Sequence, residues 1–183
     1  MANGDATVAR LFLWAQKART ADWDACFTEE LPRVYNFFRF RVGPGPVAED
    51  LTSLTFEKAW VARERYRRDR AAFSTWLFTI ARNVAVDHFR SVRVSAPLEG
   101  AAEVPAAGPT PEEVAARRSD EERLAQLLAR RSERERELLA LKYGSELDNR
   151  QIARMTGLSE SNVGTILHRA VRALRADWDE GVS

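Results

Sequence analysis

The residues between positions 73 and 93 carry the clearest chemical signal in this chain, because aromatic, basic and amide side chains alternate there. A basic stretch with one aromatic residue, 63–70, comes just before them. Basic side chains can follow a phosphate backbone, while aromatic and amide groups can engage unstacked bases. The combination suits single-stranded or melted DNA better than a closed duplex. A plainer interpretation places Trp76 in a hydrophobic core and the arginines in solvent, and for Trp76 we favour the core.

A second chemical signal lies in residues 151–174, whose spacing is typical of a helix-turn-helix. Gly157 stands where the chain must reverse, and Val163 and Leu167 recur at i, i+4 as the inward stripe of the second helix. Ser159 can cap that helix, and its outward face is basic. Such a module most often reads DNA in the major groove, although ordinary helical hairpins share the spacing.

Composition narrows the function classes. The 183 residues are 45% hydrophobic with a formal net charge of +1, so a nucleic-acid surface requires local segregation of charge. Cys26 suits a reducing cytoplasm, and a single cysteine with two distant histidines argues against a zinc site. Asp87 and His88 lack a third partner at a catalytic spacing, so we expect no enzyme, no metal and no cofactor. No apolar run is long enough to span a bilayer, so we expect no membrane insertion and a cytoplasmic location.

Helical periodicity accounts for nearly the whole chain, and no stretch alternates with period two, so we predict an all-α fold. We expect two small helical domains, and the first should contain helices near 27–38, 50–63 and 73–92. In the first two of these helices the apolar residues expected to pack are Phe27, Leu31, Val34, Tyr35, Phe38, Leu51, Leu54, Phe56, Ala59 and Trp60.

A flexible linker rich in proline and alanine is expected to join the two domains, because its prolines forbid a continuous helix. Helices at 119–130 and 132–143 should follow it and precede the helix-turn-helix. Ser132 and Glu135 have the spacing of a capping box. The expected boundaries are an N-terminal extension at 1–21, a first domain at 22–93, the linker at 94–117, a second domain at 118–176 and a tail at 177–183.

Three motifs, in order along the chain, resemble those of the extracytoplasmic-function sigma factors. Residues 48–60 resemble the family's core-polymerase-binding helix, 73–93 its promoter-melting region and 132–175 its second domain. The resemblance covers nearly everything from about position 22 to position 174. It implies a dissociable promoter-recognition subunit of bacterial RNA polymerase, with a region 2-like domain, a linker and a region 4-like helix-turn-helix domain.

By this resemblance, the first domain captures the non-template strand of the downstream (−10) promoter element as it melts. Asn83 matches the asparagine of a pocket that receives a flipped base, and extruding a base costs a few kcal/mol that such contacts must offset. The residues implied in this single-strand contact are Tyr66, Arg67, Arg68, Arg70, Phe73, Trp76, Arg82, Asn83, Asp87 and Arg90.

The second domain is implied to read the upstream (−35) element as duplex. The family's recognition helix commonly carries lysine and arginine where this chain has Gly164 and Ile166, so its upstream specificity should differ. Ile166 either packs in the core or contacts a thymine methyl group, and we favour the surface. The residues implied in this duplex contact are Arg150, Ser159, Ser161, Asn162, Thr165, Ile166, His168, Arg169 and Arg172.

The expected partners are core RNA polymerase, through its β′ clamp and β flap, promoter DNA and an anti-sigma factor. Ser53 and Leu54 stand where the family usually has Gln-Glu, so polymerase contact should depend more on their charged neighbours. The residues implied in polymerase binding are Asp50, Leu51, Ser53, Leu54, Phe56, Glu57, Lys58 and Trp60.

Two other function classes stay open on the sequence alone. A one-component helix-turn-helix regulator would bind its promoter stably without being a polymerase subunit. An adaptor held by an inhibitory partner would retain only a vestigial DNA surface, which the departures at Gly164 and Ile166 would allow.

Overall fold

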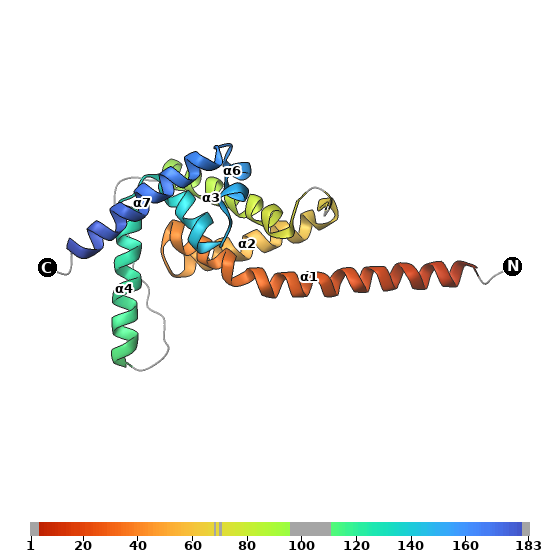
Figure 1. Ribbon diagram of the computed structural model, residues 1–183. Coiled ribbons are helices and arrows are strands. Elements are labelled where there is room, and N and C mark those ends of the chain that lie inside the picture. The colour runs from red at the N-terminus through yellow and green to blue at the C-terminus, as the bar shows by residue number, and fades with distance from the viewer. Residues whose placement is uncertain (1–3, 68, 70, 96–110, 181–183) are drawn as a thin grey trace. The chain divides into compact units, whose positions relative to one another are not determined.

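The described part of the chain is built from helices joined by turns, without a strand among the described residues (Figure 1). This computed structural model describes residues 4–67, 69, 71–95 and 111–180, and side chains within 23–67, 69, 71–92 and 120–180. The all-α prediction is therefore confirmed for these residues. The elements are α1 (Gly4–Val42), α2 (Pro46–Ala62), a short 3-10 helix η1 (Arg63–Arg65), α3 (Phe73–Ser95), α4 (Pro111–Ala129), α5 (Glu133–Leu139), a π-helical turn η2 (Ala140–Gly144), α6 (Asn149–Thr156) and α7 (Glu160–Glu180).

Two compact units divide the chain, Met1–Pro32 and Arg33–Ser183. The boundary falls inside α1 at a proline, whose ring removes one amide donor from the helix. Phe27 and Leu31 belong to the first unit and are 42% and 38% exposed, so the prediction that they pack inward was wrong. The fully buried stripe of α1 begins only at Val34.

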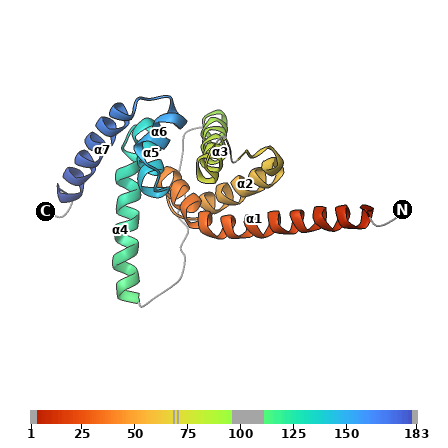
Figure 2. The same cartoon turned by 45° about the vertical axis from the view of Figure 1, so that its right-hand side comes forward.

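The second unit contains two lobes. The first lobe, residues 33–95, has the end of α1 and the helices α2 and α3, and α2 packs along α3 (Figure 2). Its centre is a group of three aromatic side chains with no exposed surface, Phe37, Phe38 and Phe78. The ring of Phe37 lies edge-on to the other two, with centroids 5.1 and 6.0 Å away. These contacts fix α1 against α3.

The second lobe, residues 111–180, contains α4, α5, η2, α6 and α7. Helix α4 starts at Pro111, earlier than the expected 119, because proline is tolerated in the first turn of a helix, where no amide donor is needed. Residues 96–110, most of the predicted linker, lie outside the described residues. The largest fully buried side chains of this lobe are Leu138, Leu139, Leu141, Leu147, Ile152 and Val163.

The capping box predicted at the start of α5 is confirmed. The Ser132 hydroxyl accepts a hydrogen bond from the Glu135 amide at 3.3 Å, and the Glu135 carboxylate accepts one from the Ser132 amide at 3.0 Å. The Ser132 hydroxyl also donates to that carboxylate at 2.7 Å. This side-chain hydrogen bond is the main reason why the pKa of Glu135 lies below its ordinary value.

Replacing Ser132 by alanine should lower the free energy of unfolding by about 0.5–2 kcal/mol at neutral pH. Because the folded state depresses the pKa of Glu135, this carboxylate stabilises the fold above its unfolded pKa and loses that effect as the pH falls through its folded pKa. The deficit of Ser132→Ala should therefore shrink in acid, as measured by urea unfolding across a pH series. Ser53→Ala is the matched control, since that exposed hydroxyl donates to the Glu49 carbonyl of its own helix at 3.0 Å. A deficit that does not change with pH would contradict the prediction.

Candidate nucleic-acid interface

The helix-turn-helix is formed by α6, α7 and the turn between them (Figure 1). Gly157 adopts a left-handed φ of 72°, so the predicted reversal occurs at the residue type that tolerates it. The Ser159 hydroxyl accepts a hydrogen bond from the Asn162 amide at 3.2 Å, which confirms the predicted cap of α7. A second capping box, Asp148 with Gln151, starts α6. This second capping box was not predicted, although its Asp-x-x-Gln spacing is present in the sequence.

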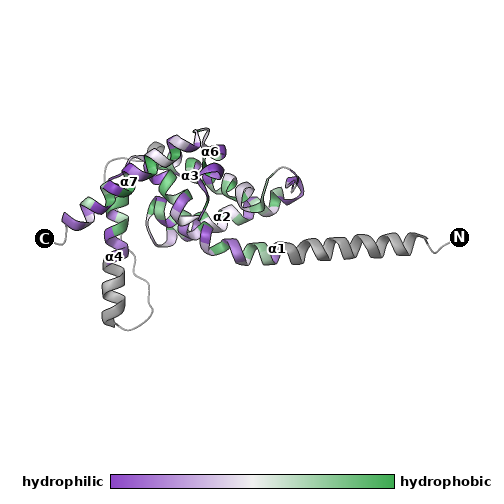
Figure 3. Cartoon of the chain, viewed as in Figure 1, coloured by the Kyte–Doolittle hydropathy of each residue, from purple (hydrophilic) through white to green (hydrophobic). Residues whose placement is uncertain are grey.

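Helix α7 is buried on one face only, through Val163, Leu167 and Ala170. Figure 3 shows hydrophilic and hydrophobic residues alternating along α7, which is typical of a helix that is buried on one side. Ile166 is half-buried, which is intermediate between the core position and the surface position considered for it. The other residues predicted to contact duplex DNA are all exposed: Arg150, Ser159, Ser161, Asn162, Thr165, His168, Arg169 and Arg172.

A groove of about 590 Å³ runs beside α7. Its cationic walls are Lys142 from η2 and Arg172 and Arg175 from α7. Tyr143 also lines the groove and is 52% exposed. Lys142 and Tyr143 were not predicted to lie beside this helix, because they belong to η2, before α6, and no periodic pattern links them to α7. The groove extends the basic surface of the second lobe.

The residues predicted to meet melted DNA include an aromatic cluster of Tyr66, Phe73 and Trp76. The three ring centroids lie 5.1–5.7 Å apart, and all three side chains are half-buried. The Tyr66 hydroxyl donates to the Ala71 carbonyl at 3.2 Å, which anchors the loop before α3. Because Trp76 is half-buried, it is only partly in the hydrophobic core, where we expected it. Arg68 and Arg70 lie outside the described residues.

The polar residues of α3 separate into two groups. Asn83, Asp87 and Arg90 are exposed, and Asp87 pairs with Lys58 of α2 at 3.5 Å. Arg82 instead reaches the second lobe, where its Nε lies 2.6 Å from a Glu137 carboxylate oxygen. Its Nη1 also donates to the Met155 carbonyl at 3.1 Å. In this structure, Arg82 is thus engaged by protein. Arg67, on the preceding loop, is exposed and lies 3.4 Å from the Asp69 carboxylate.

The surface of α2 differs from the expected one. Leu54 and Trp60 are 37% and 46% exposed, so the prediction that they pack inward was wrong. Leu51 and Phe56, which were also assigned to the polymerase-binding surface, are only 7% exposed. The reason is that α2 packs on α3 through the face that carries Leu51 and Phe56. The face that carries Leu54 and Trp60 stays partly exposed. The remaining residues assigned to this surface are exposed: Asp50, Ser53, Glu57 and Lys58.

None of the helices in the described residues is long and apolar enough to cross a membrane. Within the same residues, no group of three or more His, Cys, Asp or Glu side chains is arranged to hold a metal ion.

Comparison with known proteins gives two family matches. Sigma-70 region 2 matches residues 26–94, and Sigma-70 region 4 matches residues 121–174. The ECF RNA polymerase sigma factor SigL of Mycobacterium tuberculosis is 32% identical over 171 residues, which cover 91% of this chain and 94% of SigL. The ECF RNA polymerase sigma factor BldN of Streptomyces coelicolor is 29% identical over 178 residues, 93% of this chain and 66% of BldN.

Two solved structures have a similar fold. One is the sigma factor RpoE in complex with the anti-sigma factor NepR from Bartonella quintana, with a TM-score of 0.65 and 23% identity, covering 85% of this chain and 95% of that one. The other is CnrH in complex with the cytosolic domain of CnrY, with a TM-score of 0.62 and 24% identity, covering 90% of each chain. At this identity the likeness concerns the fold.

Proposed function

Because this chain belongs to the extracytoplasmic-function (ECF) RNA polymerase sigma factors, we propose that it directs core RNA polymerase to a distinct set of promoters and helps to open them. The observation that carries the proposal is the recognition helix α7. Its inward residues are buried, while eight of the nine residues assigned to duplex contact are exposed and Ile166 is half-buried. A helix positioned by a capped turn in this way can enter a major groove.

The two lobes divide the work. Arg169 and Arg172 contact phosphates and fix the register of α7, whereas shorter polar side chains such as Ser161 and Asn162 lie at the base edges. The first lobe holds the melted strand, with Asn83 exposed on α3 to receive a flipped base. The aromatic cluster before α3 provides a stacking surface next to it.

The partners follow from the same assignment. The exposed face of α2 binds core polymerase, and an anti-sigma factor restrains the chain until its signal arrives. The solved RpoE structure, a fold relative in complex with an anti-sigma factor, supports this last expectation. The protein then acts in the cytoplasm as a regulatory subunit, and the chemistry of RNA synthesis belongs to the polymerase.

Run-off transcription with bacterial core polymerase on a promoter pool tests the proposal. Wild-type protein should start transcription, and Arg169→Ala should reduce initiation by about tenfold, since a lost phosphate or base contact is worth roughly 1–3 kcal/mol. Arg130→Ala is the matched control, because that exposed arginine lies in the turn after α4 and outside both DNA surfaces. No initiation on any promoter would overturn the proposal. Tight promoter binding without polymerase would favour the one-component regulator.

Leu54→Ala should weaken binding to core polymerase by about fivefold to tenfold, because a partly exposed apolar side chain gains burial only in the complex. Fluorescence anisotropy of labelled protein titrated with core polymerase measures the affinity. Val61→Ala, near the end of the same helix, is the control for the loss of exposed apolar surface. The Val61 side chain is 76% exposed and was not assigned to the polymerase contact. Equal losses in the two variants would show that the contact is not centred on Leu54.

A further inference from the structure

The first two turns of α7, residues 160–167, carry no cationic side chain. Glu160 is their one charged residue, and the cationic side chains of the helix all follow them, at Arg169, Arg172 and Arg175. In a helix-turn-helix, the N-terminal part of the second helix lies against the base edges. The commonest specific contact there is an arginine or lysine that binds guanine through O6 and N7. The start of α7 therefore lacks the usual means of reading guanine.

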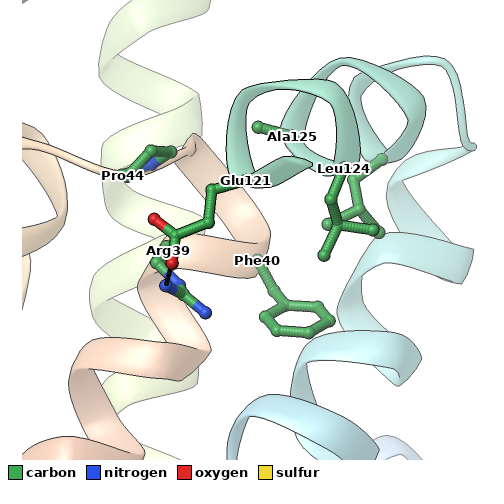
Figure 4. Close-up of a pocket in the computed structure, with 7 residues that line it drawn as sticks. Arg39, Phe40, Pro44, Glu121, Leu124 and Ala125 are labelled. Carbon is green, nitrogen blue, oxygen red and sulfur yellow. Dashed lines mark hydrogen bonds and ion pairs between the residues drawn. The ribbon is translucent and has the colours of Figure 1, made fainter. Parts of the chain in front are cut away.

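The arginines of α7 have the properties of phosphate ligands. Arg169, Arg172 and Arg175 are exposed, and none of them forms an ion pair within the described part of the chain. Arg39 shows the opposite case, because its guanidinium meets the Glu121 carboxylate at 3.1 Å beside a small apolar pocket (Figure 4). Phosphate contacts fix the register of a protein on DNA but carry no sequence information directly. Base selection thus falls to the uncharged residues at the start of α7.

Thr165 lies on the side of α7 that faces away from the buried Val163 and Ala170. Its hydroxyl donates to the Ser161 carbonyl, one turn earlier, at 3.0 Å. The hydroxyl proton is thus used inside the helix, and the oxygen retains only its capacity to accept. The other branch of the side chain is a methyl group. Thr165 therefore offers DNA one acceptor and one apolar contact, but no donor.

An A·T base pair matches this combination. In the major groove, adenine presents the N6 amino group as a donor, and thymine presents its C5-methyl group. Guanine presents the acceptors N7 and O6, which an acceptor-only oxygen repels. Cytosine has an amino donor but no methyl group. The thymine methyl group is therefore the feature by which this side chain distinguishes the two kinds of base pair.

Two neighbours of Thr165 extend the same preference. Asn162 is exposed, and a side-chain amide matches N6 and N7 of adenine in a bidentate contact. Its backbone amide donates to the Ser159 hydroxyl at 3.2 Å, which fixes the turn that carries it. Ile166 is half-buried and adds a second apolar side chain at the edge of the exposed face. Neither residue supplies a cation for guanine.

Gly164 is not required by the packing of the described residues. Its φ is not in the left-handed region, and a Cβ atom built on it would meet only the Asn149 side chain, at an ordinary 3.6 Å. A glycine inside a helix is also less favourable than an alanine. The missing side chain next to Thr165 lets the helix backbone approach the base edges closely, as a methyl contact requires.

We propose that α7 selects A·T pairs in the upstream promoter element, with Asn162 bound to an adenine and Thr165 in contact with a thymine methyl group. This inference rests on the proposed function, and it names the class of base pair that the second lobe reads. It assigns the selectivity to two uncharged residues, while the arginines of the helix supply affinity for the phosphates.

The test begins with holoenzyme assembled from core polymerase and the full chain. Duplexes randomised in the upstream element are selected by binding to it, and A·T pairs should be enriched there. Uracil then replaces the enriched thymines one at a time, which removes only the C5-methyl group. At one position, the titrated affinity of holoenzyme for the labelled duplex should fall about fourfold, as expected for one lost methyl contact.

Two variants assign the contacts to their residues. Thr165→Ser keeps the hydroxyl and lacks the methyl group, so it should bind the thymine and uracil duplexes equally. Asn162→Ala should relax the preference for A·T at another position by about tenfold and leave the uracil effect in place. Thr28→Ser is the matched control and should keep both preferences, since the exposed Thr28 hydroxyl donates in the same way to the Asp24 carbonyl at 2.9 Å. Circular dichroism verifies that each variant keeps its helices.

The outcomes separate this inference from the proposed function. Enrichment of G·C pairs throughout the upstream element would overturn the inference and leave the proposed function standing. A uracil effect that is absent from the wild-type protein, or that persists in Thr165→Ser, would do the same. A holoenzyme that enriches no sequence would overturn both.

Discussion

Replacing Phe37 by alanine is expected to lower the free energy of unfolding by about 3–5 kcal/mol, a large part of what holds a domain of this size together. Phe37 has no exposed surface and lies edge-on to Phe38 and Phe78. Its removal leaves a cavity between α1 and α3 that could close only if these packed helices shifted toward each other. Urea unfolding followed by circular dichroism measures the effect as a lower midpoint with an unchanged slope.

The same substitution at Phe27 provides the control. This side chain is 42% exposed, so less apolar surface returns to water when it is truncated, and the loss should be about half or less. If the two variants lost equal stability, the aromatic centre of the first lobe would not be the main source of its stability.

Replacing Asn83 by alanine should slow promoter opening by about tenfold or more. Asn83 is exposed on α3, where its amide can both donate and accept hydrogen bonds with the edge of an extruded base. Hydrogen bonds of this kind are worth roughly 1–3 kcal/mol. Stopped-flow fluorescence of a promoter labelled at the downstream element, with core polymerase present, gives the opening rate.

Two controls isolate this effect. Thr79→Ala changes another exposed side chain of α3, whose hydroxyl donates to the Thr75 carbonyl of its own helix at 2.8 Å, so the opening rate should stay unchanged. On a template already mismatched across the downstream element, the Asn83→Ala defect should shrink because initiation no longer depends on opening. A defect of the same size on both templates would point to a role in assembly with polymerase.

The local features were predictable from sequence because each depends on residues a few positions apart. The capping box at Ser132, the left-handed turn at Gly157 and the inward stripe of α7 all follow from spacing along one helix or its end. The start of α4 was misplaced for a local reason as well, since a proline was counted against the helix that it begins.

The exposed face of α2 was not predictable in the same way. Leu51, Leu54, Phe56 and Trp60 are all apolar and all fit a helical pattern, so periodicity could not tell which pair would be covered. The choice depends on where α3 lies, and α3 begins a loop later in the chain. Packing decided that Leu51 and Phe56 are core and that Leu54 and Trp60 are partly exposed.

By itself, the sequence determined the helical class, the two regions of the sigma family and the division of α7 into an inward and an exposed face, because a helix displays its residues in a fixed order around its axis. Only the tertiary structure decided that Arg82 pairs with Glu137 and that Gly144 lies against α1. These partners are far apart along the chain, and no periodicity connects them. Their meeting depends on how two separately folded lobes fit together, which is a property of surfaces rather than of spacing.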